Sequence, residues 1–198
     1  MSKQMLAASI AILICHAACA ADAAAAKPAA APAAAAKAAP PAAPALPAEL
    51  AQLAYFEGNW NCTGKAFASP MGPEHASTAT VHAAKAVGDR WLHVSYDEKK
   101  TAANPVPYHV GVYMGYDASK KQFVEGCVDN FGGYCNEASS GWDGEKIVFE
   151  GAIFGDGPGQ GRDTFTKKSA DEFIHSGQMQ GPDKQWIKTD EETCHKGK

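Results

Sequence analysis

The sequence predicts an all-β domain: an up-and-down antiparallel barrel of about ten strands, preceded by one short helix. Two observations lead to this prediction. After residue 58, runs of five to ten residues rich in β-branched and aromatic side chains alternate with turn signals, and a helical period is almost absent. In addition, the cysteines pair in a way that makes the first and last strands neighbours, as a closed barrel requires.

Two segments that are not expected to fold precede this domain. Residues 1–20 have the features of a secretory signal: Lys3 is the positive charge, Met5–Ile14 is an apolar stretch, and Ala18-Cys19-Ala20 fits cleavage after Ala20. The stretch is shorter than the roughly 20 residues that cross a bilayer, and no later segment is apolar enough, so no stable membrane span is expected. Lipidation of Cys19 is the alternative, but His16 stands where an aliphatic residue is usual.

Residues 21–47 hold 17 Ala and 6 Pro, and Leu46 is their one large apolar side chain. The prolines interrupt any helix, and nothing offsets the entropy of ordering, so this segment is predicted to be a disordered linker. The expected organisation is a signal peptide (1–20), a linker (21–47) and a barrel domain (48–198) in the periplasm or outside the cell.

Residues 48–198 carry 15 basic and 21 acidic side chains. A net charge of −6 gives no basic surface for nucleic acid.

Within the domain, Pro47–Phe56 is predicted to form the short helix. The expected strands are Asn59–Ala66, Thr78–Val87, Arg90–Glu98, Tyr108–Tyr116, Gln122–Asp129, Tyr134–Gly141, Lys146–Ile153, Arg162–Lys167, Glu172–Met179 and Trp186–Cys194. The turns between them contain glycine, which tolerates a positive φ, or Asp and Ser, which cap their own backbone; they include Gly88-Asp89, residues 117–120, Phe131-Gly132-Gly133, Asp143-Gly144 and Gly181-Pro182-Asp183.

Four cysteines remain after removal of the signal, and an exported chain favours two disulfides. The segment 127–135 predicts a hairpin around a glycine turn, which places Cys127 opposite Cys135 within disulfide range. The remaining pair is Cys62–Cys194, near the two ends of the domain. A zinc site is not expected, since no CxxC motif is present.

Several motifs resemble those of the domain-of-unknown-function 1579 family of exported bacterial proteins over most of residues 50–194. They are Leu53-x-x-Phe56-x-Gly58-x-Trp60-x-Cys62-x-Gly64, Gly88-Asp89-Arg90-Trp91-Leu92, Gly115-Tyr116-Asp117, Gly141-Trp142-Asp143-Gly144 and Arg162-x-Thr164-x-Thr166. The resemblance implies a calycin-like barrel, as in lipocalins, fatty-acid-binding proteins and nitrobindins, but no settled activity. It also implies that Trp60, after Gly58, closes one end of the barrel, with Arg162 or Lys188 stacked on its indole.

The expected function is non-enzymatic binding of a small, partly apolar ligand in the barrel lumen, with no resident cofactor. The residues expected to line the lumen are Val81, Leu92, Val94, Tyr96, Val110, Val112, Phe149 and Phe165. One alternative is an envelope interaction module whose barrel is filled by its own side chains. The other is a haem-binding barrel of the nitrobindin kind, with His175, before His195, as the iron ligand.

Three further histidines share one face of the predicted sheet. Pairing across Gly88-Asp89 places His82 opposite Ser95, and the next hairpin places His109 opposite Ser95 as well, with His93 nearby. Because apolar residues occupy the opposite face, we expect these histidines on the outside of the barrel and no metal.

Catalytic machinery is not expected either. The glycine-rich segment 155–161 leads into a strand rather than a helix N-terminus, so it predicts a hairpin loop and no nucleotide site. No Gly-x-Ser-x-Gly motif occurs, and the mature cysteines are all assigned to disulfides. The acidic pairs Asp97-Glu98 and Glu191-Glu192 are predicted to be solvated strand ends.

Overall fold

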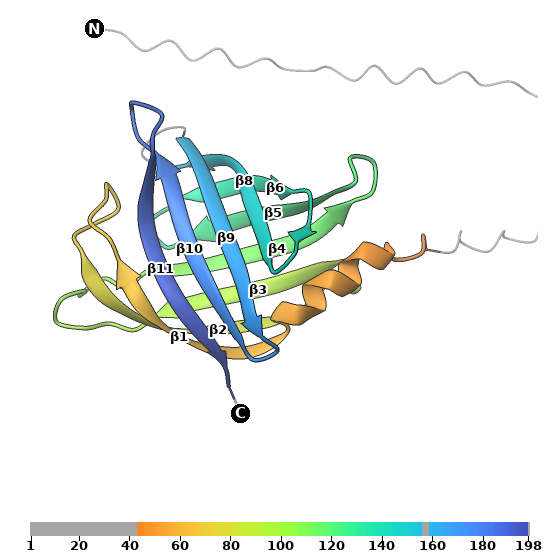
Figure 1. The fold of residues 1–198 in the computed structure, drawn as a ribbon, viewed down its shortest axis with the longest axis horizontal. Coiled ribbons are helices and arrows are strands. Elements are labelled where there is room, and N and C mark those ends of the chain that lie inside the picture. Colours follow the sequence, from red (N-terminus) through yellow and green to blue (C-terminus); the bar gives the residue numbers. More distant parts are fainter. Residues whose placement is uncertain (1–42, 156–158, 198) are drawn as a thin grey trace, which may run out of the picture. The chain divides into compact units, whose positions relative to one another are not determined.

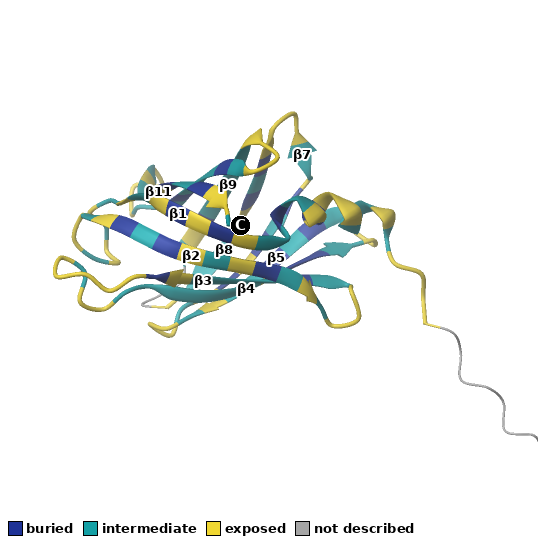
Figure 2. Ribbon diagram, turned by 90° about the horizontal axis from the view of Figure 1, so that it is seen from below, coloured by how far each residue is buried: buried dark blue, intermediate teal, exposed yellow. Residues whose placement is uncertain are grey.

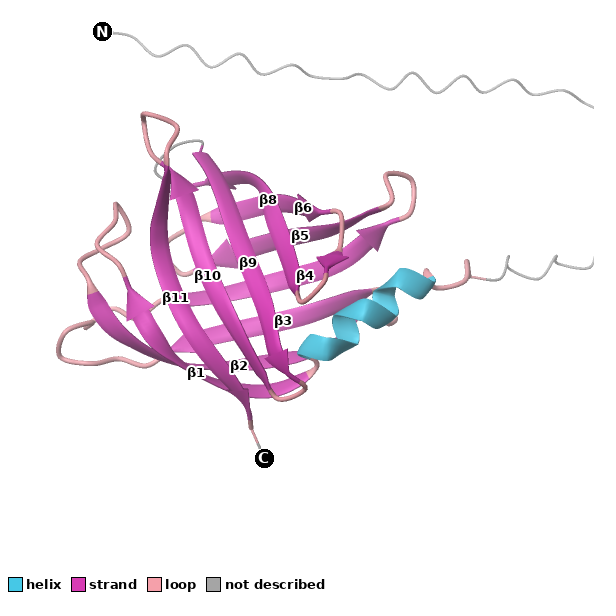
Figure 3. Cartoon of the chain, viewed as in Figure 1, coloured by secondary structure: helices cyan, strands magenta, loops and turns pink. Residues whose placement is uncertain are grey.

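The computed structural model describes residues 43–155 and 159–197; the predicted signal peptide and residues 21–42 of the linker lie outside this range. The described chain forms one 3-10 helix and a single antiparallel sheet (Figures 1 and 3). The elements are η1 (Ala48–Phe56), β1 (Gly58–Ala66), β2 (His75–Ala86), β3 (Trp91–Glu98), β4 (His109–Asp117), β5 (Gln122–Asp129), β6 (Tyr134–Ser139), β7 (Trp142–Asp143), β8 (Lys146–Phe154), β9 (Gly159–Ser169), β10 (Glu172–Gln180) and β11 (Trp186–Lys196).

The sheet closes on itself, which confirms the predicted ten-stranded barrel. Consecutive strands pair from β1 to β6 and from β8 to β11, and the pairs β6–β8 and β1–β11 complete the barrel. The two-residue β7 is a side branch that pairs with β8. Within residues 43–155 and 159–197, closure leaves no long strand with an unpaired edge. Both expected disulfides are present: Cys62–Cys194 joins the facing residues of β1 and β11, and Cys127–Cys135 joins those of β5 and β6.

The strand ends differ modestly from those predicted. The predicted strand Tyr134–Gly141 ends at Ser139, because the chain turns at Gly141, where φ is 103°. Conversely, β9 begins at Gly159 rather than Arg162, so part of the predicted glycine-rich loop is strand. The turns at Gly88 and Gly144 have φ values of 65° and 57°, as their glycines predict.

One end of the barrel is closed by aromatic side chains. The helix η1 places Leu53 and Phe56 in the core and leaves its outer face exposed (Figure 2). The indole of Trp60 is 1% exposed, and its Nε1 donates a hydrogen bond of 2.8 Å to the carbonyl of Phe56. Its ring packs edge-on against Phe173, with centroids 4.8 Å apart. Trp60 therefore seals this end, as a floor under the lumen.

The cation that stacks on Trp60 is not the predicted one. Lys196 lies over the indole, with its Nζ 5.1 Å from the ring centroid. Arg162 lies over Trp186 at 3.9 Å and pairs with Glu150, and Lys188 approaches Phe67. The reason is that successive side chains of a strand point to opposite faces of the sheet. Asp163 and Phe165 on β9 face the lumen, so Arg162, which directly precedes Asp163, faces outward.

The three histidines on β2, β3 and β4 point away from the core. The β2–β3 register is the predicted one, with His82 opposite Ser95. The β3–β4 register is displaced by two residues, so that His109 faces Asp97 instead of Ser95. The two strands are joined by a ten-residue connection, which has no tight turn to fix the register. Because side chains alternate with a period of two, a shift of two residues leaves His109 on the outer face of the sheet. Among the described residues these histidines form no metal-binding cluster.

No helix within residues 43–155 or 159–197 is long and apolar enough to cross a membrane.

Candidate functional site

The interior of the barrel has an apolar part and an acidic part. The apolar part lies near the closed end and holds Leu92, Phe149 and Phe165. The neighbouring wall, called the apolar wall below, carries side chains that pack against this core: Val81, Val94, Tyr96 and Val112. Val110 lies opposite Tyr96 and has the same orientation. Farther from the floor, the inward positions of β5, β6, β9, β10 and β11 carry charged residues. These are Glu125, Glu137, Asp163, His175, Asp190 and Glu192.

The centre of the acidic part is a histidine held between two carboxylates. Nε2 of His175 lies 2.9 Å from Oδ1 of Asp163, and its Nδ1 lies 3.0 Å from Oδ2 of Asp190. Burial alone would lower the pKa of His175, but the charges of Asp190 and Asp163 outweigh it and raise this pKa well above its ordinary value. The imidazole is therefore a cation that donates both protons.

For two glutamates beside this group, the charge of His175 lowers the pKa but does not outweigh burial. Glu125 and Glu137 face each other across β5 and β6, and their side chains are 4% and 2% exposed. Burial, followed by the charge of Asp163, raises the pKa of both carboxyls, that of Glu137 to about 8. In each, Oε2 is buried and has no hydrogen-bond partner among the described residues.

A third group of polar side chains surrounds Glu192. Ser77 and Tyr96 both hydrogen-bond to its Oε1, the tyrosine at 2.9 Å. Burial nevertheless raises the pKa of Glu192, since it outweighs these two hydrogen bonds. Burial and the charge of Glu192 likewise raise the pKa of Tyr96. Tyr96 therefore remains a donor, and it connects the apolar wall to the acidic one.

The two acidic pairs, Asp97-Glu98 and Glu191-Glu192, were predicted to be solvated, but only one residue of each pair is exposed. Side chains alternate between the two faces of a strand, so the other residue points inward. Asp97 and Glu191 are exposed, whereas Glu98 and Glu192 are buried, at 6% and 3%. Glu98 accepts hydrogen bonds from the side chain of Asn104 and from the backbone N–H of Tyr108, and its other oxygen lies 2.9 Å from Nε2 of His75. This carboxylate thus anchors the connection between β3 and β4.

The sequence profile of the family described as "Protein of unknown function (DUF1579)" matches residues 47–196, the whole of the barrel with its helix. The chain belongs to the DUF1579 family. Among solved structures, it is similar to the crystal structure of Rv2717c from M. tuberculosis, with 16% identity and a TM-score of 0.59 over 78% of this chain and 100% of the other. At that identity the likeness shows a shared fold. No curated protein matches significantly.

Haem does not fit His175 of this DUF1579 chain. An axial ligand must offer iron a free ring nitrogen, but both nitrogens of His175 are occupied by carboxylates. The carboxylates around it would also repel the haem propionates. His195, the second candidate, is 61% exposed near the end of β11, and its nearest charged partner is Glu172.

Glycine at position 177 makes room for the histidine cluster. A Cβ there would lie 2.3 Å from Oδ1 of Asp190. We therefore expect Gly177→Ala to displace this carboxylate, to lower the unfolding free energy by about 1–3 kcal/mol, and to lower the pKa of His175. Urea denaturation measures the first effect, and NMR titration of the imidazole measures the second.

Gly126→Ala is the matched control, because its Cβ would meet nothing closer than 3.9 Å in the neighbouring strand. Equal losses of stability in the two variants, with the His175 titration unchanged, would show that Asp190 is not held against Gly177.

Proposed function

We propose that this DUF1579 protein is an exported, non-catalytic barrel that holds a small, partly apolar ligand in its lumen. The observation that carries the proposal is that inward-facing side chains are incompletely packed. His175, Asp163 and Asp190 point into the barrel, yet their side chains are 21%, 30% and 31% exposed. A barrel filled by its own side chains, the alternative predicted from the sequence, would bury such groups.

The apolar wall supports the same interpretation. Val94 and Val112 face each other across β3 and β4 and point toward the core, but both are only half-buried. Exposed apolar surface on the inside of a barrel gains free energy when an apolar ligand covers it, by about 25 cal/mol for each Å² removed from water. These valines are therefore the expected contacts of the apolar part of the ligand.

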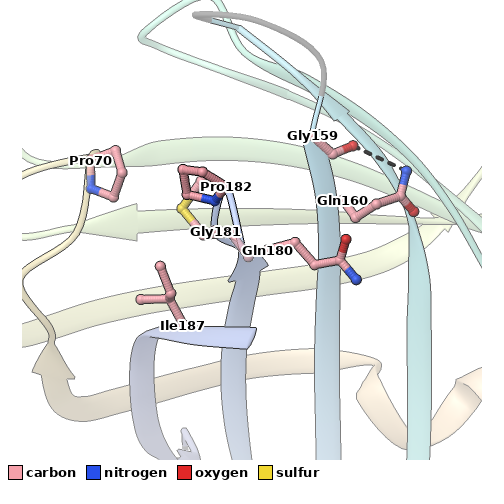
Figure 4. Close-up of a pocket in the computed structure, with 8 residues that line it drawn as sticks. Pro70, Gly159, Gln160, Gln180, Gly181, Pro182 and Ile187 are labelled. Atoms are coloured by element: carbon pink, nitrogen blue, oxygen red, sulfur yellow. Dashed lines mark hydrogen bonds between the residues drawn. The ribbon is translucent and has the colours of Figure 1, made fainter. Parts of the chain in front are cut away.

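A pocket of about 530 Å³ lies at the end of the barrel opposite η1. Its walls come from the β1–β2 connection, the start of β9, the end of β10 and the start of β11 (Figure 4). Met179 and Ile187, which pair across β10 and β11, contribute its apolar surface. The size of this pocket suits a small organic molecule, and its position suits an entrance.

The charges of the interior restrict the ligand further. Five carboxyl groups face the interior, and Asp163 and Asp190 already share the imidazolium of His175. The described interior therefore offers no free cation to an anionic head group, whereas its carboxyl oxygens can accept hydrogen bonds from a neutral or cationic donor. We therefore propose a ligand with an apolar body and an uncharged or positively charged polar end.

Fluorescent probes of matched size test this proposal. We expect the neutral probe N-phenyl-1-naphthylamine to bind saturably and the anionic probe 8-anilinonaphthalene-1-sulfonate to bind at least ten times more weakly. Val94→Trp, which fills the lumen, should weaken the neutral probe at least tenfold, whereas Val128→Trp on the exposed outer face of β5 should not. The absence of saturable binding, together with a bare mass in native mass spectrometry of the exported protein, would favour the filled interaction module instead.

Export is supported by the two disulfides, which persist in oxidising compartments. Expression of the full chain in a bacterial host should yield a periplasmic protein whose intact mass begins at Ala21. A lipid-modified mass beginning at Cys19 would establish the lipoprotein alternative, and a cytoplasmic full-length chain would contradict export.

A further inference from the structure

Three carboxylates from three strands meet inside the barrel. Glu125 on β5 and Glu137 on β6 are directly opposite each other, and Asp163 comes from β9. One oxygen of each residue lies within 4.8 Å of the others. Like charges placed directly across an antiparallel pair destabilise a sheet, so this arrangement needs a compensating group.

The glycine at position 161 leaves room for the side chain of Glu137 to reach across the sheet toward β9. The strand neighbour of Glu137 on β8 is Gly151, and the next position along is Gly161 on β9. A Cβ at Gly161 would lie 2.5 Å from Oε1 of Glu137. The carboxylate therefore occupies space that a side chain at position 161 of β9 would otherwise fill. Gly151 acts differently, because a Cβ there would lie 2.3 Å from the backbone oxygen of Asn136, so this glycine permits the close approach of β8 to β6.

The protein supplies too little positive charge for this cluster. Among the described residues, His175 is the cation whose charge acts on Glu125 and Glu137, and Asp163 and Asp190 already share that imidazolium. Oε2 of Glu125 and Oε2 of Glu137 remain buried without a partner among the described residues. An unpaired buried carboxylate is costly unless it takes up a proton or contacts a cation.

We propose that Glu125, Glu137 and Asp163 form a binding site for a divalent metal cation that prefers oxygen ligands, such as Mn²⁺, Mg²⁺ or Ca²⁺. Such ions bind oxygen at about 2.0–2.6 Å, which places two oxygens on the same ion no more than about 5 Å apart. The observed spacing satisfies this limit. Carboxylates without thiolate or free imidazole ligands suit these ions better than Zn²⁺ or Cu²⁺.

His175 is the positioning residue for this site. Its Nε2 fixes one oxygen of Asp163, in the way that groups outside the ligand set orient metal-binding carboxylates. The metal ligands lie on the acidic wall, whereas Val94 and Val112 on the apolar wall are the contacts proposed for the apolar body of the organic ligand, so the two sites can be tested separately.

Titration with Mn²⁺, followed by electron paramagnetic resonance and calorimetry, tests the inference. The full barrel is first freed of metal with a chelator, and no organic probe is present. We expect one saturable site, with an affinity that falls at least 100-fold in the Glu125→Gln/Glu137→Gln variant. Glu150→Gln is the matched control, because it removes a carboxylate from neighbouring β8 that pairs with Arg162 on the outer face. It should leave the affinity unchanged.

A second measurement on the wild type does not depend on the folding of any variant. Tb³⁺ bound at this site should keep fewer waters than the free ion, as judged from its luminescence decay in H₂O and D₂O, and Mn²⁺ should displace it. Failure of the wild type to bind Mn²⁺, equal affinities in the double variant and the wild type, or a fully hydrated Tb³⁺ would each overturn the metal site. Because the naphthylamine probe is measured separately, its failure would leave this result standing.

Discussion

Replacement of Cys62 and Cys194 by Ala is expected to lower the unfolding free energy by about 5 kcal/mol, which is comparable to the whole stability of many domains. The bond joins residues 132 positions apart, so it removes much of the freedom of the unfolded chain. It also joins β1 to β11, the contact by which the first and last strands meet. Urea denaturation of the oxidised variant and wild type measures the difference.

The second disulfide provides a matched comparison within the same molecule. Cys127 and Cys135 are 8 positions apart, and chain-entropy arguments give about 2.5 kcal/mol for a loop of that length. The Cys127→Ala/Cys135→Ala variant should therefore lose about half as much stability. If the two double variants were equally stable, the long loop would not be the source of the stabilisation, and the role assigned to barrel closure would be wrong.

The fold could be predicted in detail because its determinants are local or covalent. Turn residues set the hairpins, and the 127–135 hairpin left one partner for Cys62, which placed the last strand beside the first. The predicted register was wrong where no tight turn joins two strands. Residues 99–108 connect β3 to β4, and His109 pairs with Asp97, two positions from the predicted Ser95. That connection is organised by the carboxylate of Glu98, a contact that sequence patterns do not contain.

The acidic wall was missed for a different reason. Glu191-Glu192 was predicted to be a solvated strand end, and no position was predicted for Glu125 or Glu137. The alternation of side chains along each strand, counted from the cysteines, places Glu192, Glu125 and Glu137 inside. Cys127 and Cys135 face inward, and so do Glu125 and Glu137 two residues away; Cys194 likewise implies Glu192. The signal was therefore present, but only the closed barrel shows that Asp163 and His175, far away in sequence, meet the same glutamates. The contact of Lys196 with Trp60 depends equally on closure.

The acidic wall predicts an uncommon dependence of stability on pH in the metal-free protein. Folded Glu137 keeps its proton up to about pH 8, whereas in the unfolded chain it releases the proton near pH 4.5. Folded His175 likewise keeps its proton beyond pH 6.5, and the raised pKa of Glu125 acts in the same direction. The folded state therefore binds more protons than the unfolded state, so the unfolding free energy falls as pH rises. Asp190, with its lowered pKa, acts oppositely but only below about pH 4.

Between pH 5 and pH 8 we expect a loss on the order of 3 kcal/mol, measured by urea denaturation in the presence of a chelator. Glu137→Gln, whose neutral amide replaces the protonated carboxyl, should flatten this slope. Glu74→Gln removes an exposed carboxylate that pairs with Lys65, and it should keep the slope of the wild type. A stability that is level or rises over this range would mean that the buried glutamates are ionised in the folded barrel. If Mn²⁺ occupies the cluster, it replaces these protons, so its addition should restore most of the stability lost at pH 8 and little at pH 5.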